Sequence, residues 1–188
     1  MLMSKHSIPT LIALALAVSA APVRADDVAK EEKARHICVE AENHYRRGAF
    51  KEALRSVDKA LESDPNLGAA YELRARLRHV ARDFSGQTED ATRALGLLKN
   101  SGGTKELVTK GGALLLLGKP DSALEDFNAA LKAEPSDPAA LAGRARAWRE
   151  KGEFAKAVED LDGALQILPS DALWLYTRAH SRYDLGEN

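Results

Sequence analysis

Residues able to carry out catalysis or to bind a metal are few and scattered in this sequence. It has five histidines and one cysteine. It contains no His-Glu-x-x-His motif, no Gly-x-Ser-x-Gly motif and no phosphate-binding glycine loop. His36 and His44 would lie two turns apart on one helix face, but two ligands at that distance make a poor metal site. We therefore expect no catalytic residue, no metal and no cofactor, and a protein that is not an enzyme.

Cys38 is the only cysteine, so an internal disulfide is excluded. The expected role of this residue is that of a small apolar side chain packed within a helix. The alternative is a reactive thiol, or a thiol that pairs with another chain in an oxidising compartment. A redox or thiol enzyme would depend on this residue alone, and we do not expect that function.

Composition favours helices and argues against a nucleic-acid partner. Apolar residues, mainly leucine and alanine, make up 45% of the chain, and aromatic residues only 5%, which favours helix over strand. The formal net charge is -1, and loss of a leader that carries Lys5 and Arg24 but no acid would leave about -3. A chain without a basic excess is a poor match for nucleic acid.

The first 25 residues have the order of a secretory signal peptide. Lys5 precedes an apolar run at residues 11–21, and small residues surround a site after Ala25. Cleavage after Ala25 is expected, with cleavage after Ala20 as the alternative. The apolar run is shorter than the roughly 20 residues that span a bilayer, so we expect no membrane span after leader removal. The protein is expected to be exported, to the periplasm in a Gram-negative bacterium and otherwise as a secreted protein.

One sequence block recurs and organises the rest of the chain. Residues 118–138 read GKPDSALEDFNAALKAEPSDP, and close relatives of this block lie at residues 152–171 and 48–66. Each copy predicts a glycine turn, an amphipathic helix with alanines on one side and a proline at its end. A single copy has an apolar face that it cannot bury alone, so the copies must stack on one another.

The period of the repeat is 34 residues, with two residues inserted after Ser101. Small residues recur in the first helix of each unit, and an Ala-Leu pair recurs late in the second helix. Small residues are needed where helices cross, because a larger side chain would push the backbones apart. The small residues are Ala41, Ala75, Gly111, Ala145 and Ala179, and the pairs begin at Ala60, Ala94, Ala130 and Ala164.

This period, the turn glycines, the Ala-Leu pairs and the closing prolines are similar to those of the tetratricopeptide repeat. The resemblance covers residues 34–188 and implies an all-α fold, a right-handed α-solenoid of stacked antiparallel helix pairs. It predicts a signal peptide at 1–25, a helical extension at 26–33, repeats at 34–67, 68–101, 104–137 and 138–171, and a terminal helix at 172–185.

The second repeat departs from the pattern. Arg82 replaces the turn glycine, Gln87 replaces an alanine, and Gly102 and Gly103 lengthen the connection that follows. That connection is either a neutral loop variant or a hinge that changes the pitch of the superhelix. Beyond it, Asp137 and the proline after it predict a helix cap followed by proline at the first helical position.

The resemblance implies that the first helices of successive repeats line a concave groove that binds a peptide. Several relatives hold a partner's terminal carboxylate with a set of Lys, Asn and Arg residues, but Cys38 and Glu42 stand at the first two of those positions. We expect the groove to be lined by Glu72, Arg76, Lys105, Arg146, Arg149, Tyr176, His180 and Tyr183, with Cys38, Glu42, Tyr45, His79, Val108, Gly112, Leu115 and Ala142 beside them.

These residues predict a non-enzymatic scaffold or adaptor that binds an acidic peptide segment of a partner protein. Arginine forks suit carboxylates, and tyrosines add rigid contact area. The arginines in question are Arg76, Arg146 and Arg149. The competing expectation is that they pair instead with acidic side chains of the protein itself, which are Glu72, Glu150 and Asp184.

The apolar start of the terminal helix allows a second function. Leu173, Trp174, Leu175 and Tyr176 are strongly apolar for a terminal helix, which normally presents a polar outer face. Either this group packs back on the fourth repeat as a capping helix, or it pairs with another subunit. The alternative function is therefore a self-associating structural protein, a homo-oligomer formed through its terminal helix.

Overall fold

Helices in this protein begin and end close to its glycines, prolines and capping residues. The computed structural model describes residues 25–186, and in that range it has nine α-helices and no strand. The predicted leader lies outside the described residues except for Ala25, where α1 begins. The helices are α1 (Ala25–Arg46), α2 (Phe50–Ser63), α3 (Gly68–Val80), α4 (Phe84–Leu97), α5 (Thr104–Leu116), α6 (Pro120–Ala133), α7 (Pro138–Glu150), α8 (Phe154–Ile167) and α9 (Ala172–Asp184).

The turns inside the helix pairs require a left-handed backbone conformation. Gly48, Gly118 and Gly152 have φ of +73°, +68° and +76° in these turns, a conformation that glycine adopts without steric cost. Arg82 occupies the same place between α3 and α4, with φ of +60°. It is the one non-glycine residue in the described range with a positive φ. The second repeat therefore keeps the turn, at a steric cost of roughly 1–2 kcal/mol.

The predicted caps of the later helices are present. Asp137 caps α7, because its Oδ1 atom accepts hydrogen bonds from the backbone N–H groups of Ala139 (2.8 Å) and Ala140 (2.9 Å). Pro120 and Pro138 occupy the first helical positions of α6 and α7, where proline's missing N–H costs nothing.

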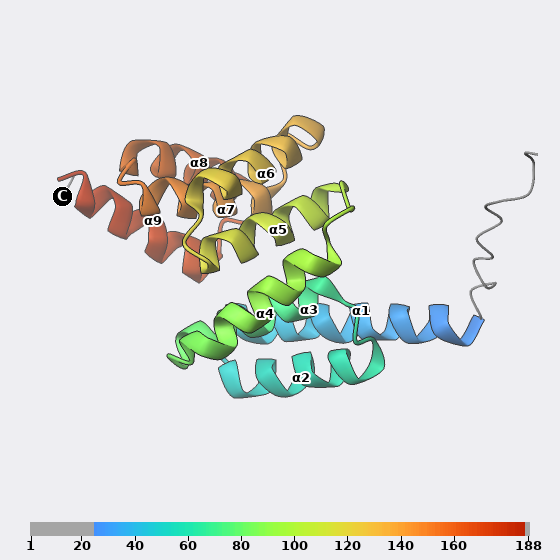
Figure 1. Cartoon of the computed structure of the whole chain (residues 1–188). Helices are drawn as coiled ribbons and strands as arrows, with labels where there is room; N and C mark the ends of the chain where they lie inside the picture. The colour runs from blue at the N-terminus through green and yellow to red at the C-terminus, as the bar shows by residue number, and fades with distance from the viewer. Residues whose placement is uncertain (1–24, 187–188) are drawn as a thin grey trace, which may run out of the picture.

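Antiparallel pairs of helices stack side by side to form the fold (Figure 1). The pairs are α1 with α2, α3 with α4, α5 with α6 and α7 with α8, and α9 packs on α8. Ala41, Ala75 and Ala145 are fully buried where helices cross, as the repeat predicts. The predicted all-α solenoid of four helix pairs and a terminal helix is confirmed. Since α1 runs unbroken through residues 26–33, the boundary between extension and first repeat stays a prediction.

A ladder of polar contacts, which the sequence analysis did not predict, joins helices both within pairs and between successive pairs. A basic residue in each of α3, α5, α7 and α9 bonds to a polar side chain sixteen positions away on a neighbouring second helix. Two of the acidic partners, Asp90 and Asp160, are buried. The basic residues therefore supply the hydrogen bonds that buried carboxylates require. The bonded pairs are Arg74 with Asp58 (3.1 Å) and Asp90 (2.8 Å), Lys110 with Asp126 (3.2 Å), Arg144 with Asn128 (2.9 Å) and Asp160 (2.6 Å), and Arg178 with Asp162 (2.7 Å).

Candidate functional site

One half of the predicted groove is filled by an internal charge network. Arg76 of α3 pairs with Glu42 of α1 and donates from Nε to Glu72 at 3.1 Å. Its guanidinium carbon also lies 4.6 Å from the centroid of the Tyr45 ring. Burial acts to lower the pKa of Arg76, but the Glu72 and Glu42 carboxylates raise it by more than burial lowers it. The net shift is upward, so the residue stays charged. Glu72 and Arg76 are therefore already paired within the protein.

Close packing of α3 against α5 narrows this half of the groove. Glu72 is 7% exposed and lies over Gly112, where an added Cβ atom would come within 2.5 Å of its Oε1 atom. Cys38 is buried in the same region, and burial together with Glu42 and Glu72 raises the pKa of its thiol to about 12. A thiol with so high a pKa is a weak nucleophile at neutral pH, which favours the packing role predicted for Cys38.

The burial of Glu72 makes a testable contribution to the pH dependence of stability. Burial raises the pKa of this carboxyl above its usual value, against the opposing effect of Arg76. In the pH window between the unfolded and the raised folded pKa, the folded chain holds a proton that the unfolded chain lacks. Stability from this group is therefore full below the unfolded pKa and is lost as pH rises through the folded pKa.

Replacing Glu72 with glutamine should remove that loss. We expect urea denaturation midpoints to fall less between pH 5 and pH 7.5 in Glu72→Gln than in the unmodified chain. Glu62→Gln, at an exposed position of α2, is the matched control and should follow the unmodified chain. Equal slopes for the two variants would contradict the prediction.

The other half of the groove, between α7 and α9, has charge available for a ligand. Arg146 is half-buried and makes no ion pair or side-chain hydrogen bond among residues 25–186. Arg149 bonds through Nη2 to His180 (3.2 Å) and Asp184 (3.3 Å), while its buried Nε atom has no partner in the described part of the chain. Together with Glu150, the two arginines line a shallow hollow of about 270 Å³.

Exposed aromatic residues lie on α9, which Arg149 contacts through His180. His180 stacks edge-on with Tyr176, with 6.1 Å between ring centroids, and with Tyr183, with 6.4 Å. The two tyrosines are 65% and 72% exposed. These rings therefore offer flat apolar area beside the Arg149 guanidinium, which suits a peptide that carries both carboxylates and apolar side chains.

The predicted groove residues thus fall into three groups. Glu72 and Arg76 lie in the internal network, and Lys105 is exposed in the first turn of α5, away from the arginines at the end of α7. Two of the arginines pair with acidic side chains of the protein itself, as the competing expectation holds: Arg76 with Glu72 and Arg149 with Asp184. Arg146 makes no such ion pair within residues 25–186. The α7–α9 site, as we call it, consists of Arg146, Arg149, Glu150, Tyr176, His180 and Tyr183.

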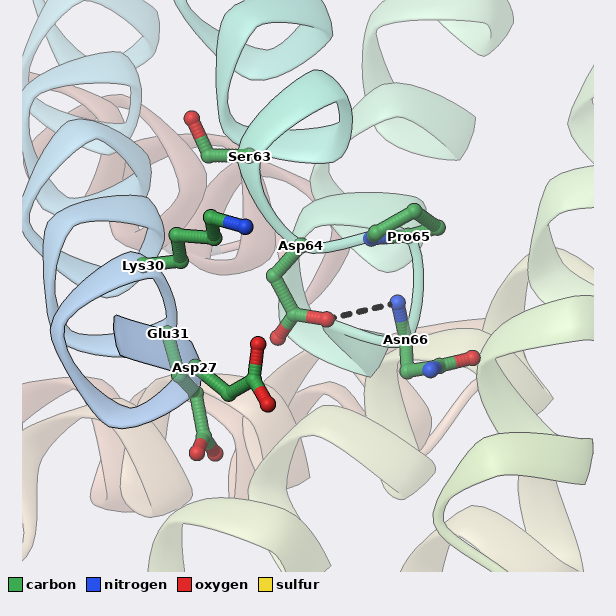
Figure 2. A pocket seen from close by; sticks show the side chains of 7 residues that line it. All are labelled: Asp27, Lys30, Glu31, Ser63, Asp64, Pro65 and Asn66. Carbon is green, nitrogen blue, oxygen red and sulfur yellow. Dashed lines mark hydrogen bonds between the residues drawn. The ribbon is translucent and has the colours of Figure 1, made fainter. Parts of the chain in front are cut away.

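A larger hollow at the other end of the molecule does not form a comparable site. It has a volume of about 530 Å³ and is lined by the start of α1 and the link between α2 and α3 (Figure 2). Asp64 in that link uses one carboxylate oxygen to accept from the backbone N–H of Asn66 at 2.9 Å. No group of three or more potential metal ligands that could hold an ion occurs within residues 25–186.

Stacked antiparallel helix pairs define a helical repeat protein of the α-solenoid class. Residues 109–172 match the model of the tetratricopeptide repeat family, so this part of the chain is similar to tetratricopeptide repeats. Its fold is one that suits protein–protein interaction. No curated protein matches the chain.

Solved structures with the same fold include two proteins with pilus-related names. One is PilW, described as a widely conserved type IV pilus biogenesis factor, which is 20% identical with a TM-score of 0.55, over 82% of this chain and 70% of PilW. The other is PilF of Pseudomonas aeruginosa, which is 19% identical with a TM-score of 0.52, over 85% of this chain and 72% of PilF. At this identity the likeness shows the fold alone. None of the helices in residues 25–186 is long and apolar enough to cross a membrane.

Proposed function

We propose that this protein is an exported, non-enzymatic scaffold or adaptor that binds an acidic peptide segment of a partner protein at the α7–α9 site. Export rests on the leader-like residues 1–25, and the compartment would be the periplasm in a Gram-negative bacterium. The fold supplies a stack of parallel first helices, which present side chains at regular intervals to an extended or helical segment.

The observation that carries the proposal is the state of Arg146. Arg146 makes no ion pair or side-chain hydrogen bond within residues 25–186, so its guanidinium donors are available for charge-assisted hydrogen bonds with an incoming carboxylate. Glu150 is exposed, and partial burial raises the pKa of its carboxyl while Arg146 and His79 act in the opposite direction. A ligand carboxylate would pair with Arg146, and Tyr176 and Tyr183 would contact its neighbouring side chains.

A displayed library of random peptides tests this function. Selection on the immobilised chain, residues 26–188, should enrich sequences rich in Asp and Glu with at least one aromatic or aliphatic residue, and they should bind with a stoichiometry of one to one. The proposal fails if repeated rounds enrich no peptide, or only basic ones.

Self-association is a second candidate function, and the exposed face of α9 favours it. Trp174 packs on the core of the fourth pair, as a capping helix would, but Leu173 and Leu175 are 42% and 38% exposed. Ala179 is exposed, although its equivalent Ala145 is fully buried, because no helix follows α9 within residues 25–186. A second copy would bury this face.

Light scattering across a wide concentration range tests self-association. The homo-oligomer predicts a mass that rises with concentration and a lower association in Leu175→Asp. A constant monomer mass at every concentration would exclude this function.

A further inference from the structure

The two ends of the solenoid touch. Arg46, the last residue of α1, pairs through Nη2 with Oδ2 of Asp171, although 125 positions separate the two residues. The guanidinium carbon of Arg46 also lies 5.0 Å from the centroid of the Trp174 ring in the first turn of α9. Figure 1 shows the C-terminal end of α1 near the beginning of α9. The ion pair joins the first helix pair to the terminal helix, and we call this closed arrangement the ring.

Asp171 is held rigidly to receive Arg46. It caps α9, because its Oδ1 atom accepts from the backbone N–H of Trp174 at 3.0 Å. Its side chain is 7% exposed, whereas that of Arg46 is 33% exposed. One carboxylate oxygen therefore stabilises the helix end and the other holds α1, which gives the contact a fixed geometry.

The contact is nevertheless small. Few other contacts join α1 to α9. The contact between α1 and α9 thus depends on one ion pair and one cation–π contact, and water partly reaches Arg46.

The connection between the second and third pairs is suited to bending. Residues 98–103 join α4 to α5, whereas the other links between pairs are residues 64–67, 134–137 and 168–171. Gly102 and Gly103 are exposed, and a Cβ atom added at Gly102 would meet no atom within 4 Å. A longer link with two adjacent exposed glycines can absorb backbone rotation more easily than the shorter ones.

We propose that Arg46, Asp171 and Trp174 form a latch that keeps the concave face closed, and that the two halves of the solenoid open about residues 98–103 when a peptide enters. This inference rests on the proposed function. A peptide opens the ring to the extent that it binds the open form more tightly than the closed form. The latch therefore sets the affinity and the rate of loading at the α7–α9 site.

Distance measurements without any ligand test the latch itself. Nitroxide labels at Asn43→Cys and Ser170→Cys, both exposed positions, report the separation of α1 and α9 by pulsed electron paramagnetic resonance. Cys38 is buried with a raised pKa, so labelling favours the introduced thiols. We expect one short distance in the otherwise unmodified chain.

Loss of the latch should populate a longer distance. We expect Arg46→Ala to raise the open fraction about fivefold, the combined worth of an ion pair and a cation–π contact. Asp171→Asn should do the same, because asparagine caps a helix as well as aspartate but carries no charge. Arg47→Ala is the matched control, since Arg47 is exposed and makes no ion pair within residues 25–186. Unchanged distances in both latch variants would overturn the proposal.

Locking the ring tests its link to binding. Joining the two introduced thiols of the doubly substituted chain, Asn43→Cys and Ser170→Cys, with a short crosslinker should slow association of a library-selected acidic peptide at least about tenfold. Arg46→Ala should speed it. If selected peptides bind but neither change alters the rate, the latch is wrong and the proposed function stands. If no peptide is selected, the proposed function fails while the distance measurement still decides the latch.

Discussion

Replacing Phe127 with alanine is expected to lower the free energy of unfolding by about 3–5 kcal/mol. Phe127 is 1% exposed and lies at the centre of the core formed by the third and fourth pairs. Its ring fills a slot between two glycines, since a Cβ atom at Gly111 would lie 2.7 Å from the ring and one at Gly143 would lie 2.4 Å from it. Neither glycine has a side chain that could fill the cavity left by alanine.

The same slot makes both of its glycines intolerant of a methyl group, and Gly143 is the closer of the two to the ring. Ala is favoured over Gly inside helices by up to about 1 kcal/mol, so Gly163→Ala in α8 should be neutral or stabilising, because its Cβ would only contact Leu141 at 3.4 Å. Gly143→Ala should be destabilising, because the rigid Phe127 ring must move. Urea denaturation of the three variants measures these differences. A Gly143→Ala variant as stable as Gly163→Ala would show that the slot is not tight.

Reversing the charge of Arg146 is expected to reduce the affinity for a selected acidic peptide at least tenfold, from the loss of about 1.5–3 kcal/mol per charge-assisted hydrogen bond. Arg146→Glu also adds a second carboxylate to that of Glu150, so two negative charges would face the incoming acid. The effect should shrink as salt concentration rises, since exposed charges are screened. Isothermal titration calorimetry at two salt concentrations measures both quantities.

A control separates this site from the net charge of the chain. Lys132→Glu makes the same change of charge at an exposed position of α6, on a second helix and away from the α7–α9 site. It should alter the affinity by less than about twofold. Equal losses in the two variants would mean that the peptide responds to overall charge and not to Arg146.

The fold could be predicted because its determinants repeat. Each turn glycine, buried alanine and closing proline acts within its own helix pair or on the next one. The same steric and backbone requirements therefore recur in every repeat and select the same residue type at the same position. Arg82 is recognisable in the sequence as a departure, but only the structure shows that its backbone takes the conformation of the missing glycine. The polar ladder is equally periodic, and its spacing of sixteen could have been found in the sequence.

The groove could be predicted only in part, because its chemistry depends on contacts that do not repeat. Arg76 pairs with Glu42, which lies one period earlier in the sequence. Whether Arg76 contacts that residue or a ligand depends on how closely α3 and α5 pack at Gly112. The pair of Arg46 and Asp171 joins positions 125 residues apart and depends on the curvature of the whole solenoid. No local pattern encodes that curvature.

The central claim is that a peptide binds on the concave face between α7 and α9, and site-specific photocrosslinking tests it most directly. A benzoylphenylalanine in place of Tyr176 should crosslink a library-selected acidic peptide, and the same group in place of Glu125, exposed on α6, should not. Crosslinking from position 125 alone, or equally from both positions, would contradict the account. A crosslinked dimer of the chain from position 176 in place of a peptide adduct would contradict it as well and would favour self-association.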